Sequence, residues 1–150
     1  MRRRHAGFTL LELIVVMVIV GILVTIGFTI YGDIRQKEVL RQGAQQFSAD
    51  LNNSRSIARR LSQTVQVTAN SGTSTYTITR PISGTSTMTT FTLPENMTFT
   101  APLSVTFQQP YGFAPQFLNS DGQQTTLTLA NRSISVAVIG LAGKVVVREN

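Results

Sequence analysis

Glu12 is the residue whose type and position most clearly indicate chemistry in this sequence. It is the only charged residue in the apolar run of residues 8–30. A carboxylate in a membrane helix costs roughly 3 kcal/mol unless it reaches the headgroups or pairs with a cation, so its presence there indicates a functional pairing. The alternative is a surface glutamate at the level of the headgroups, which would cost less and have no role.

The composition excludes several kinds of catalytic and metal site. The chain has no cysteine, which excludes disulfides, thiolate metal sites and cysteine nucleophiles. The one histidine, His5, precedes the apolar run, so a histidine-based triad or zinc cluster on the rest of the chain is excluded as well. A hydrolase would have only carboxylates to use, and no motif surrounds a serine. We therefore predict a protein that is not an enzyme, with no catalytic residue, metal or cofactor.

The charge and the hydrophobicity are both concentrated at the N-terminus. The net charge is +6, of which three charges are Arg2, Arg3 and Arg4, and the remaining ten basic and seven acidic side chains leave +3. This is weak evidence for an anionic partner. Residues 13–30 are almost all apolar, and as a helix they would extend about 27 Å, enough to cross a bilayer.

The flanks of this apolar run predict its orientation. Basic residues precede it and no comparable cluster follows it, which predicts a cytoplasmic N-terminus and an extracytoplasmic remainder. An ordinary signal anchor or a removable secretory signal is the alternative. A cleavage site of the Ala-x-Ala kind is absent from residues 28–32, which favours a retained helix.

The residues around Glu12 resemble a known signal. The string Gly7-Phe8-Thr9-Leu10-Leu11-Glu12-Leu13, between a short basic leader and an apolar helix, resembles the type III signal of type IV pilins and type II secretion pseudopilins. The resemblance implies that a prepilin peptidase cuts between Gly7 and Phe8 and that Phe8 is then N-methylated. It also implies that Glu12 pairs with the N-terminal amine of a neighbouring subunit during filament assembly. Opposite charges attract strongly when buried, and either one alone is penalised, so such a pair would check the register of assembly.

The next segment, residues 33–61, has the composition of a long amphipathic helix without proline. A stripe at alternating four- and three-residue spacing predicts its buried face; the stripe consists of Leu40, Ala44, Phe47, Leu51, Ser54, Ala58 and Leu61. The stripe fits a coiled-coil seam or a face packed under a β-domain, and the small residues favour the second. The other face is basic, as expected of a solvated surface; its residues are Arg35, Lys37, Arg41, Arg55, Arg59 and Arg60.

Residues 43–60 carry a second resemblance. The spacing of Phe47, Leu51, Arg55 and Ala58 is similar to that in the stem of GspH/FimT minor pseudopilins. Many major pilins have a proline near the middle of the apolar helix, where this chain has glycines instead. The missing proline distinguishes this chain from the bulk subunits of such filaments.

From residue 63 onward the pattern is typical of short antiparallel strands. Alternating Thr, Val, Ile and Phe predict strands over 64–68, 75–79, 89–93, 97–100, 104–107, 125–129, 133–139 and 144–148. Gly, Pro, Asn and Asp turns separate them. A glycosylated, mucin-like stalk is the alternative, but such stalks lack the interleaved apolar residues. Residues 108–119 form an aromatic and proline-rich connection, which would either cover an open sheet edge or contact another subunit or a cargo protein.

The last strand offers an alternative function. Residues 140–148 resemble the end of the GspH/FimT domain, where some FimT proteins have a Gly-Arg-x-Arg motif linked to DNA capture. Here Gly143 and Lys144 keep the glycine and one cation, but Val146 replaces the second arginine. Lys144 and Arg148 fall on one face of the strand, and we expect Arg132 nearby. These three are the candidate DNA contacts, and they would bind weakly, with strong salt dependence.

Together these observations predict an α+β, pilin-like fold in which a long N-terminal helix, half membrane-spanning and half amphipathic, packs on a C-terminal antiparallel β-sheet domain. The expected parts are a leader (1–7), an assembly helix (8–31), a stem helix (32–62) and a β-rich head (63–150). The expected function is that of a minor pseudopilin or pilin in a type II secretion pseudopilus or type IV pilus. The expected location is the inner membrane. Expected partners are other pilins, the prepilin peptidase, the membrane and an inner-membrane assembly platform, with DNA as the alternative.

Overall fold

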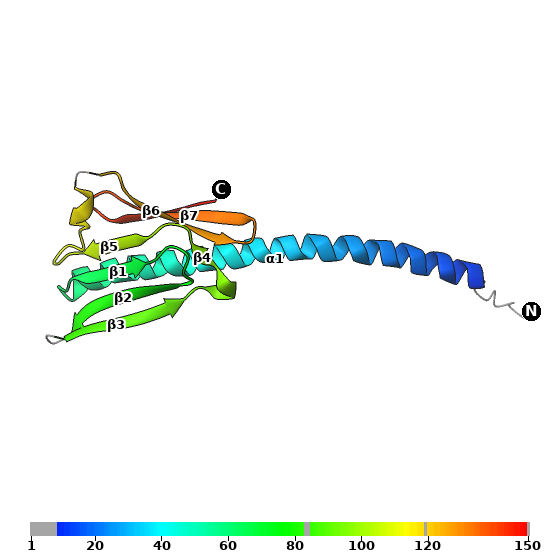
Figure 1. Cartoon of the computed structure of the whole chain (residues 1–150), viewed down its shortest axis with the longest axis horizontal. Helices are drawn as coiled ribbons and strands as arrows, with labels where there is room; N and C mark the ends of the chain where they lie inside the picture. Colours follow the sequence, from blue (N-terminus) through cyan, green and yellow to red (C-terminus); the bar gives the residue numbers. More distant parts are fainter. Residues whose placement is uncertain (1–8, 83–84, 119, 150) are drawn as a thin grey trace, which may run out of the picture. The chain divides into compact units, whose positions relative to one another are not determined.

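The computed structural model describes residues 9–82, 85–118 and 120–149. The chain divides into two compact units, Met1–Arg35 and Gln36–Asn150. One helix, α1 (Leu10–Arg60), contributes its first residues to the first unit and the remainder to the second (Figure 1). The absence of proline between residues 10 and 60 allows its hydrogen bonding to continue without a break.

In the first unit, α1 presents apolar side chains on all sides. Every side chain from residue 10 to residue 25 is exposed. The described residues contain no helix with a stretch long and apolar enough to cross a membrane. The predicted membrane segment, residues 13–30, lies partly outside the described part, which leaves out the side chains of residues 26–30.

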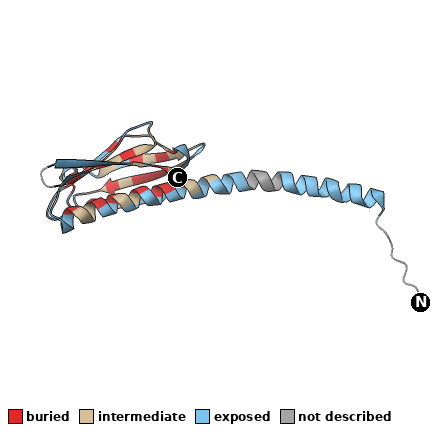
Figure 2. Cartoon of the chain, turned by 90° about the horizontal axis from the view of Figure 1, so that it is seen from below, coloured by how far each residue is buried: buried red, intermediate tan, exposed pale blue. Residues whose placement is uncertain are grey.

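The second unit is an α+β head, in which the later half of α1 packs on two antiparallel sheets (Figures 1 and 2). The first sheet has the order β3-β2-β1-β5, and the second the order β4-β6-β7-β8. The strands are β1 (Val65–Ala69), β2 (Thr75–Ile82), β3 (Thr85–Thr92), β4 (Thr98–Phe99), β5 (Leu103–Phe107), β6 (Gly122–Leu129), β7 (Arg132–Ile139) and β8 (Lys144–Glu149). Two short 3-10 helices, Pro94–Asn96 and Pro115–Phe117, lie between strands. All eight predicted strands are present, and the fold class is confirmed.

The apolar stripe of the stem is the helix side of the core. Leu40, Ala44, Phe47, Leu51, Ser54 and Ala58 are all buried, as expected for a face packed under a β-domain. Leu61 is 61% exposed, so its predicted place in the stripe is wrong, because α1 ends at Arg60. Both sheets contribute core residues, among them Val67, Ile78 and Phe99.

Close packing of the helix against the loop before β4 depends on a glycine. Gly43 is buried beside Ala44, and a Cβ built there would lie 2.6 Å from Cε of Met97. Met97 is fully buried. The missing side chain therefore makes the space that the Met97 thioether fills.

Candidate functional site

The predicted processing site, Gly7 and Phe8, lies outside the described residues. Glu12, the predicted assembly residue, lies in the first turn of α1. Its backbone N–H donates to Thr9 Oγ1 at 3.3 Å, and the Leu13 N–H donates to the Thr9 carbonyl at 3.3 Å. Thr9 is therefore the N-cap, with the Ser/Thr-x-x-Glu spacing of a capping box.

The capping geometry leaves the Glu12 carboxylate available. The hydroxyl of Thr9 and the main chain of Glu12 make the cap, and the side chain of Glu12 is exposed. Within the described part of the chain, this carboxylate forms no ion pair. A negative charge in the first turn of a helix is favoured by about 0.3–1 kcal/mol. The cap fixes the main chain of Glu12 and leaves its exposed carboxylate outside the capping bonds, as pairing with a cation of another chain would require.

The three candidate DNA contacts do not lie together. Lys144 pairs with Ile139 and Arg148 with Ser135, so both cations project from one face of β8, about 13 Å apart along the strand. Arg132 shares its face of β7 with the buried Ile134 and is on the opposite side of the sheet. The structure thus brings Lys144 and Arg148 to one face and separates Arg132 from them.

Arg148 shares a hollow with an acidic residue. A hollow of about 190 Å³ over β6 and β7 is lined by both Asp121 and Arg148, along with the polar Gln123 and Gln124. A carboxylate that lines the same hollow as the guanidinium lowers the positive potential that a phosphate would encounter there. This part of the predicted DNA surface is therefore weaker than the strand pattern alone suggests.

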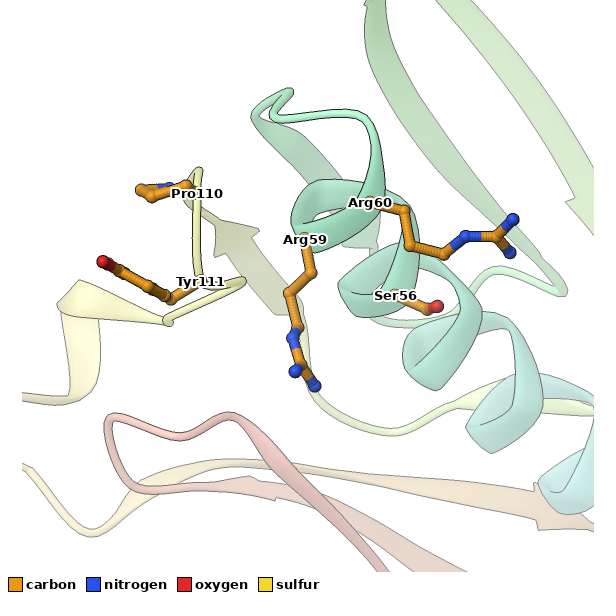
Figure 3. Close-up of a pocket in the computed structure, with 5 residues that line it drawn as sticks. All are labelled: Ser56, Arg59, Arg60, Pro110 and Tyr111. Carbon is orange, nitrogen blue, oxygen red and sulfur yellow. The ribbon is translucent and has the colours of Figure 1, made fainter.

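A more basic hollow lies at the end of α1. It has a volume of about 450 Å³ and is lined by Ser56, Arg59, Arg60, Pro110 and Tyr111, with no acidic residue (Figure 3). The Arg59 side chain points into the space between helix and loop, whereas Arg60 extends away from Tyr111 (Figure 3). The cations lie in the last turn of the helix, where its dipole favours positive charge.

The loop that forms the other wall is fixed on the helix through Gly112. This residue has φ +66, and a Cβ there would lie 2.7 Å from Arg59 Cγ and 2.8 Å from the Arg55 carbonyl oxygen. The Gly112 N–H donates to the Gln108 carbonyl, and the Gln108 N–H donates to the Phe113 carbonyl, each at 2.7 Å. The sequence predicted that the stem arginines form a solvated face. It gave no signal that the loop around Gly112, distant in sequence, would lie beside Arg55 and Arg59.

The aromatic connection fulfils one of its two predicted roles through residues 114–117. Ala114 and Phe117 are buried, and the Gln116 amide can donate to the Thr106 carbonyl at 3.1 Å and accept from the Thr106 N–H at 2.9 Å. This part covers the open edge of β5. The other aromatic residues of this connection lie outside the core: Tyr111 is 64% exposed and Phe113 is 43% exposed. The centroids of their rings are 5.4 Å apart.

A polar cluster between helix and sheet was missed by the sequence patterns. The Tyr76 hydroxyl donates to the Asp50 carboxylate, and Gln46 Nε2 donates to the Tyr76 oxygen at 3.5 Å. Burial, with a further contribution from Asp50, raises the pKa of Tyr76 well above its usual value. The Tyr76 ring meets Phe47 edge to face at 4.9 Å. The cluster attaches the stem to β2.

Comparison with known protein families gives a match at the N-terminus. Residues 2–28 match the family model described as the prokaryotic N-terminal methylation motif. Comparisons with curated proteins and with solved structures gave no match. The matched segment contains Gly7, Phe8 and Glu12 and the start of α1. In this segment the chain is similar to type IV pilin-like proteins, a structural family whose members are cut by prepilin peptidase, methylated, anchored in a membrane and assembled with other pilins.

Proposed function

We propose that the chain is a minor pseudopilin or pilin subunit of the GspH/FimT kind, which acts in or at the tip of a type II secretion pseudopilus or type IV pilus and serves protein secretion. The observation that carries the proposal is the methylation motif at residues 2–28, which overlaps the start of a helix whose later half packs in the core of a β-rich head. Residues 1–7 are the leader, 8–31 the assembly helix, 32–62 the stem and 63–150 the head.

In this proposal the protein is a single-pass protein of the inner membrane. Residues 13–30 are the membrane segment, the N-terminus is cytoplasmic and the head is extracytoplasmic, as the leader arginines favour. An inner-membrane assembly platform and neighbouring pilins are the partners. Cleavage after Gly7 creates the amine of Phe8, and the carboxylate of Glu12 pairs with that amine on an adjacent subunit.

Processing is tested by Gly7→Ala in cells with an active prepilin peptidase. We expect the variant to keep its leader, and the wild-type chain to begin with N-methylated Phe8, as measured by intact mass of the membrane-extracted protein. Gly21→Ala is the matched control, because Gly21 lies within α1 with no atom within 4 Å of a built Cβ. Normal cleavage of Gly7→Ala, or an unmodified Phe8 in the wild type, would contradict the proposal.

The assembly role of Glu12 is tested apart from its place in the helix. Glu12→Gln keeps the backbone N–H that bonds to Thr9 and removes only the charge, so insertion and cleavage should be normal, whereas recovery in sheared filaments should fall at least about 10-fold. Thr9→Val removes the cap and keeps the charge, and it should assemble better than Glu12→Gln. Equal recovery of Glu12→Gln and wild type would rule out the pairing.

DNA capture for uptake is the second candidate function, and the acid-free hollow beside Arg59 and Arg60 favours it. A gel-shift series with residues 36–150 should show retardation that is lost as salt rises, since each phosphate contact releases counterions. Arg59→Ala/Arg60→Ala should weaken binding more than Lys144→Ala/Arg148→Ala, whose surface includes Asp121. Arg41→Ala is the control, because Arg41 faces Glu149. If low salt gives no retardation, this function is excluded.

A further inference from the structure

The two sheets of the head have four edge strands, and three of them are protected against pairing with another strand. β4 has only two residues, and β8 carries Lys144, Arg148 and Glu149, whose charges disfavour an added strand. On β5 the edge groups are bonded to side chains: the Ser104 N–H donates to Gln123 Oε1 at 3.0 Å, and the Thr106 main chain meets the Gln116 amide.

The fourth edge, β3, lacks these protections. It is eight residues long, Thr-Ser-Thr-Met-Thr-Thr-Phe-Thr, with no charge and no proline. Residues 85–90 and 92 are exposed, and Met88 is 67% exposed. Figure 1 shows β3 as the outer strand of its sheet. A long, uncharged, exposed edge is a template for strand addition.

The hydrogen-bond pattern shows which residues of β3 face outward. The Leu93 N–H donates to the Ser74 carbonyl at 2.8 Å, so these two residues form a hydrogen-bonded pair. Hydrogen-bonded and non-hydrogen-bonded pairs alternate along an antiparallel ladder, so Tyr76 and Phe91 form the next hydrogen-bonded pair between β2 and β3. By this alternation, Pro81 and Ser86 form a non-hydrogen-bonded pair. This fits Pro81, which has no N–H to donate to β3. The outward main-chain groups are therefore those of Ser86, Met88, Thr90 and Thr92, and no described residue bonds to them.

We propose that β3 pairs antiparallel with β3 of a second copy of this chain, about a two-fold axis at Thr89. An axis at Thr89 opposes Met88 to Thr90 and Ser86 to Thr92, so all four outward residues on each strand pair, with about eight hydrogen bonds. A two-fold axis at Met88 or at Thr90 would leave one outward residue of each strand without a partner inside the other copy's β3. The pattern of the edge thus selects one register.

Self-complementarity makes a second copy the fitting partner. When two copies of one strand pair about a two-fold axis, like residues come near each other, so like charges would repel. β3 has no charged residue and avoids this repulsion, whereas β8, with Lys144 and Arg148, would not. Threonine pairs across strands already occur in this head: Thr68 and Thr77 hydroxyls lie 2.6 Å apart, and those of Thr98 and Thr128 lie 3.2 Å apart. A two-fold pairing also closes on itself and gives a dimer of heads rather than an open array. It requires neither cleavage at Gly7 nor filament assembly.

The absence of cysteine from the chain allows a direct test in membranes with the full-length protein. Thr89→Cys should give a disulfide-linked dimer on mild oxidation, because the axis places its side chain opposite its own copy. Ser86→Cys should not, since its copy lies about 20 Å away along the strand. Co-expression of Ser86→Cys and Thr92→Cys should restore cross-linking between the two variants. Arg148→Cys on β8 is the control for random collision.

A variant in the Thr89→Cys background tests the edge itself. Met88→Pro removes an outward N–H and leaves the bonds to β2 intact, so it should lower the cross-linked fraction at least about 10-fold. Met88→Thr should keep it. If Met88→Pro lowers the yield of folded protein, Thr90→Lys provides the same test through charge. No dimer from Thr89→Cys, equal dimer from Arg148→Cys, or undiminished dimer from both edge variants would overturn the pairing.

Discussion

The two halves of α1 are the same secondary structure in opposite surroundings. From residue 10 to residue 25 every side chain is exposed, although nearly all are apolar. From Leu40 to Ala58 the helix has one buried stripe and one polar face. The later half meets its partner, two β-sheets, within its own unit. The first half carries the methylation motif, and its apolar surface is the kind that a membrane or neighbouring helices cover. The difference shows that the pattern around a helix, rather than its helicity, indicates where it finds its partner.

The largest expected effect is a truncation in the stem. Phe47 is fully buried and touches the rings of Tyr76 and Phe99. Phe47→Ala should lower the free energy of unfolding of the head by about 3–5 kcal/mol, measured by denaturant titration of the full chain in detergent. Ile19→Ala, a truncation at a side chain that is 51% exposed, should change it by less than about 0.5 kcal/mol. Similar losses from both would contradict the contrast between the halves.

A pair of glycines gives a sharper comparison, because both lie within α1. A side chain at Gly43 would meet Met97, whereas nothing lies within 4 Å of a Cβ at Gly21. Gly43→Leu should destabilise the head by about 1–3 kcal/mol through overpacking. Gly21→Leu should leave the stability of the head unchanged, as followed by thermal unfolding. Restored stability in Gly43→Leu/Met97→Ala would identify the thioether as the contact responsible.

The attachment of the stem to β2 predicts a pH dependence. The raised pKa of Tyr76 means that the unfolded chain ionises first, so stability is complete below the ordinary tyrosine pKa of about 10 and falls as pH rises above it. Tyr76→Phe should cost about 1 kcal/mol at neutral pH and reduce this alkaline slope. Unfolding titrations between pH 8 and roughly pH 11 measure both effects. Tyr111→Phe, at an exposed side chain, is the control, and an unchanged slope in Tyr76→Phe would contradict the assignment.

The smallest expected effect is at the ion pair between the stem and β8. Arg41 Nε and Glu149 Oε1 are 3.8 Å apart, and both side chains are about half exposed, at 56% and 51%. Glu149→Gln should change the free energy of unfolding by less than about 0.5 kcal/mol, and the change should vanish in high salt. A loss near that of Gly43→Leu would mean that polar contacts, in addition to the buried stripe, hold the helix to the sheets.

Local patterns were sufficient for much of the fold. The four-and-three spacing of the stem predicted its buried face correctly up to Ala58, and failed at Leu61 because spacing alone does not show where a helix ends. Alternating residues predicted all eight strands. Gly122, which precedes the predicted strand 125–129, begins β6, where a Cβ would lie 2.1 Å from the Val138 carbonyl oxygen. That close approach arises from the neighbouring strand and has no local signal.

The sequence by itself determined the N-terminal signal, the charge pattern, the helical stem and the alternation of the strands, because each depends on residues close together in the chain. Only the tertiary structure decided the arrangement into two sheets, the separation of Arg132 from Lys144 and Arg148, the basic hollow beside Tyr111 and the unprotected edge of β3. These features join residues that are distant in sequence. The physical reason is that pairing register and edge position depend on which strands become neighbours, and short-range preferences do not specify that choice.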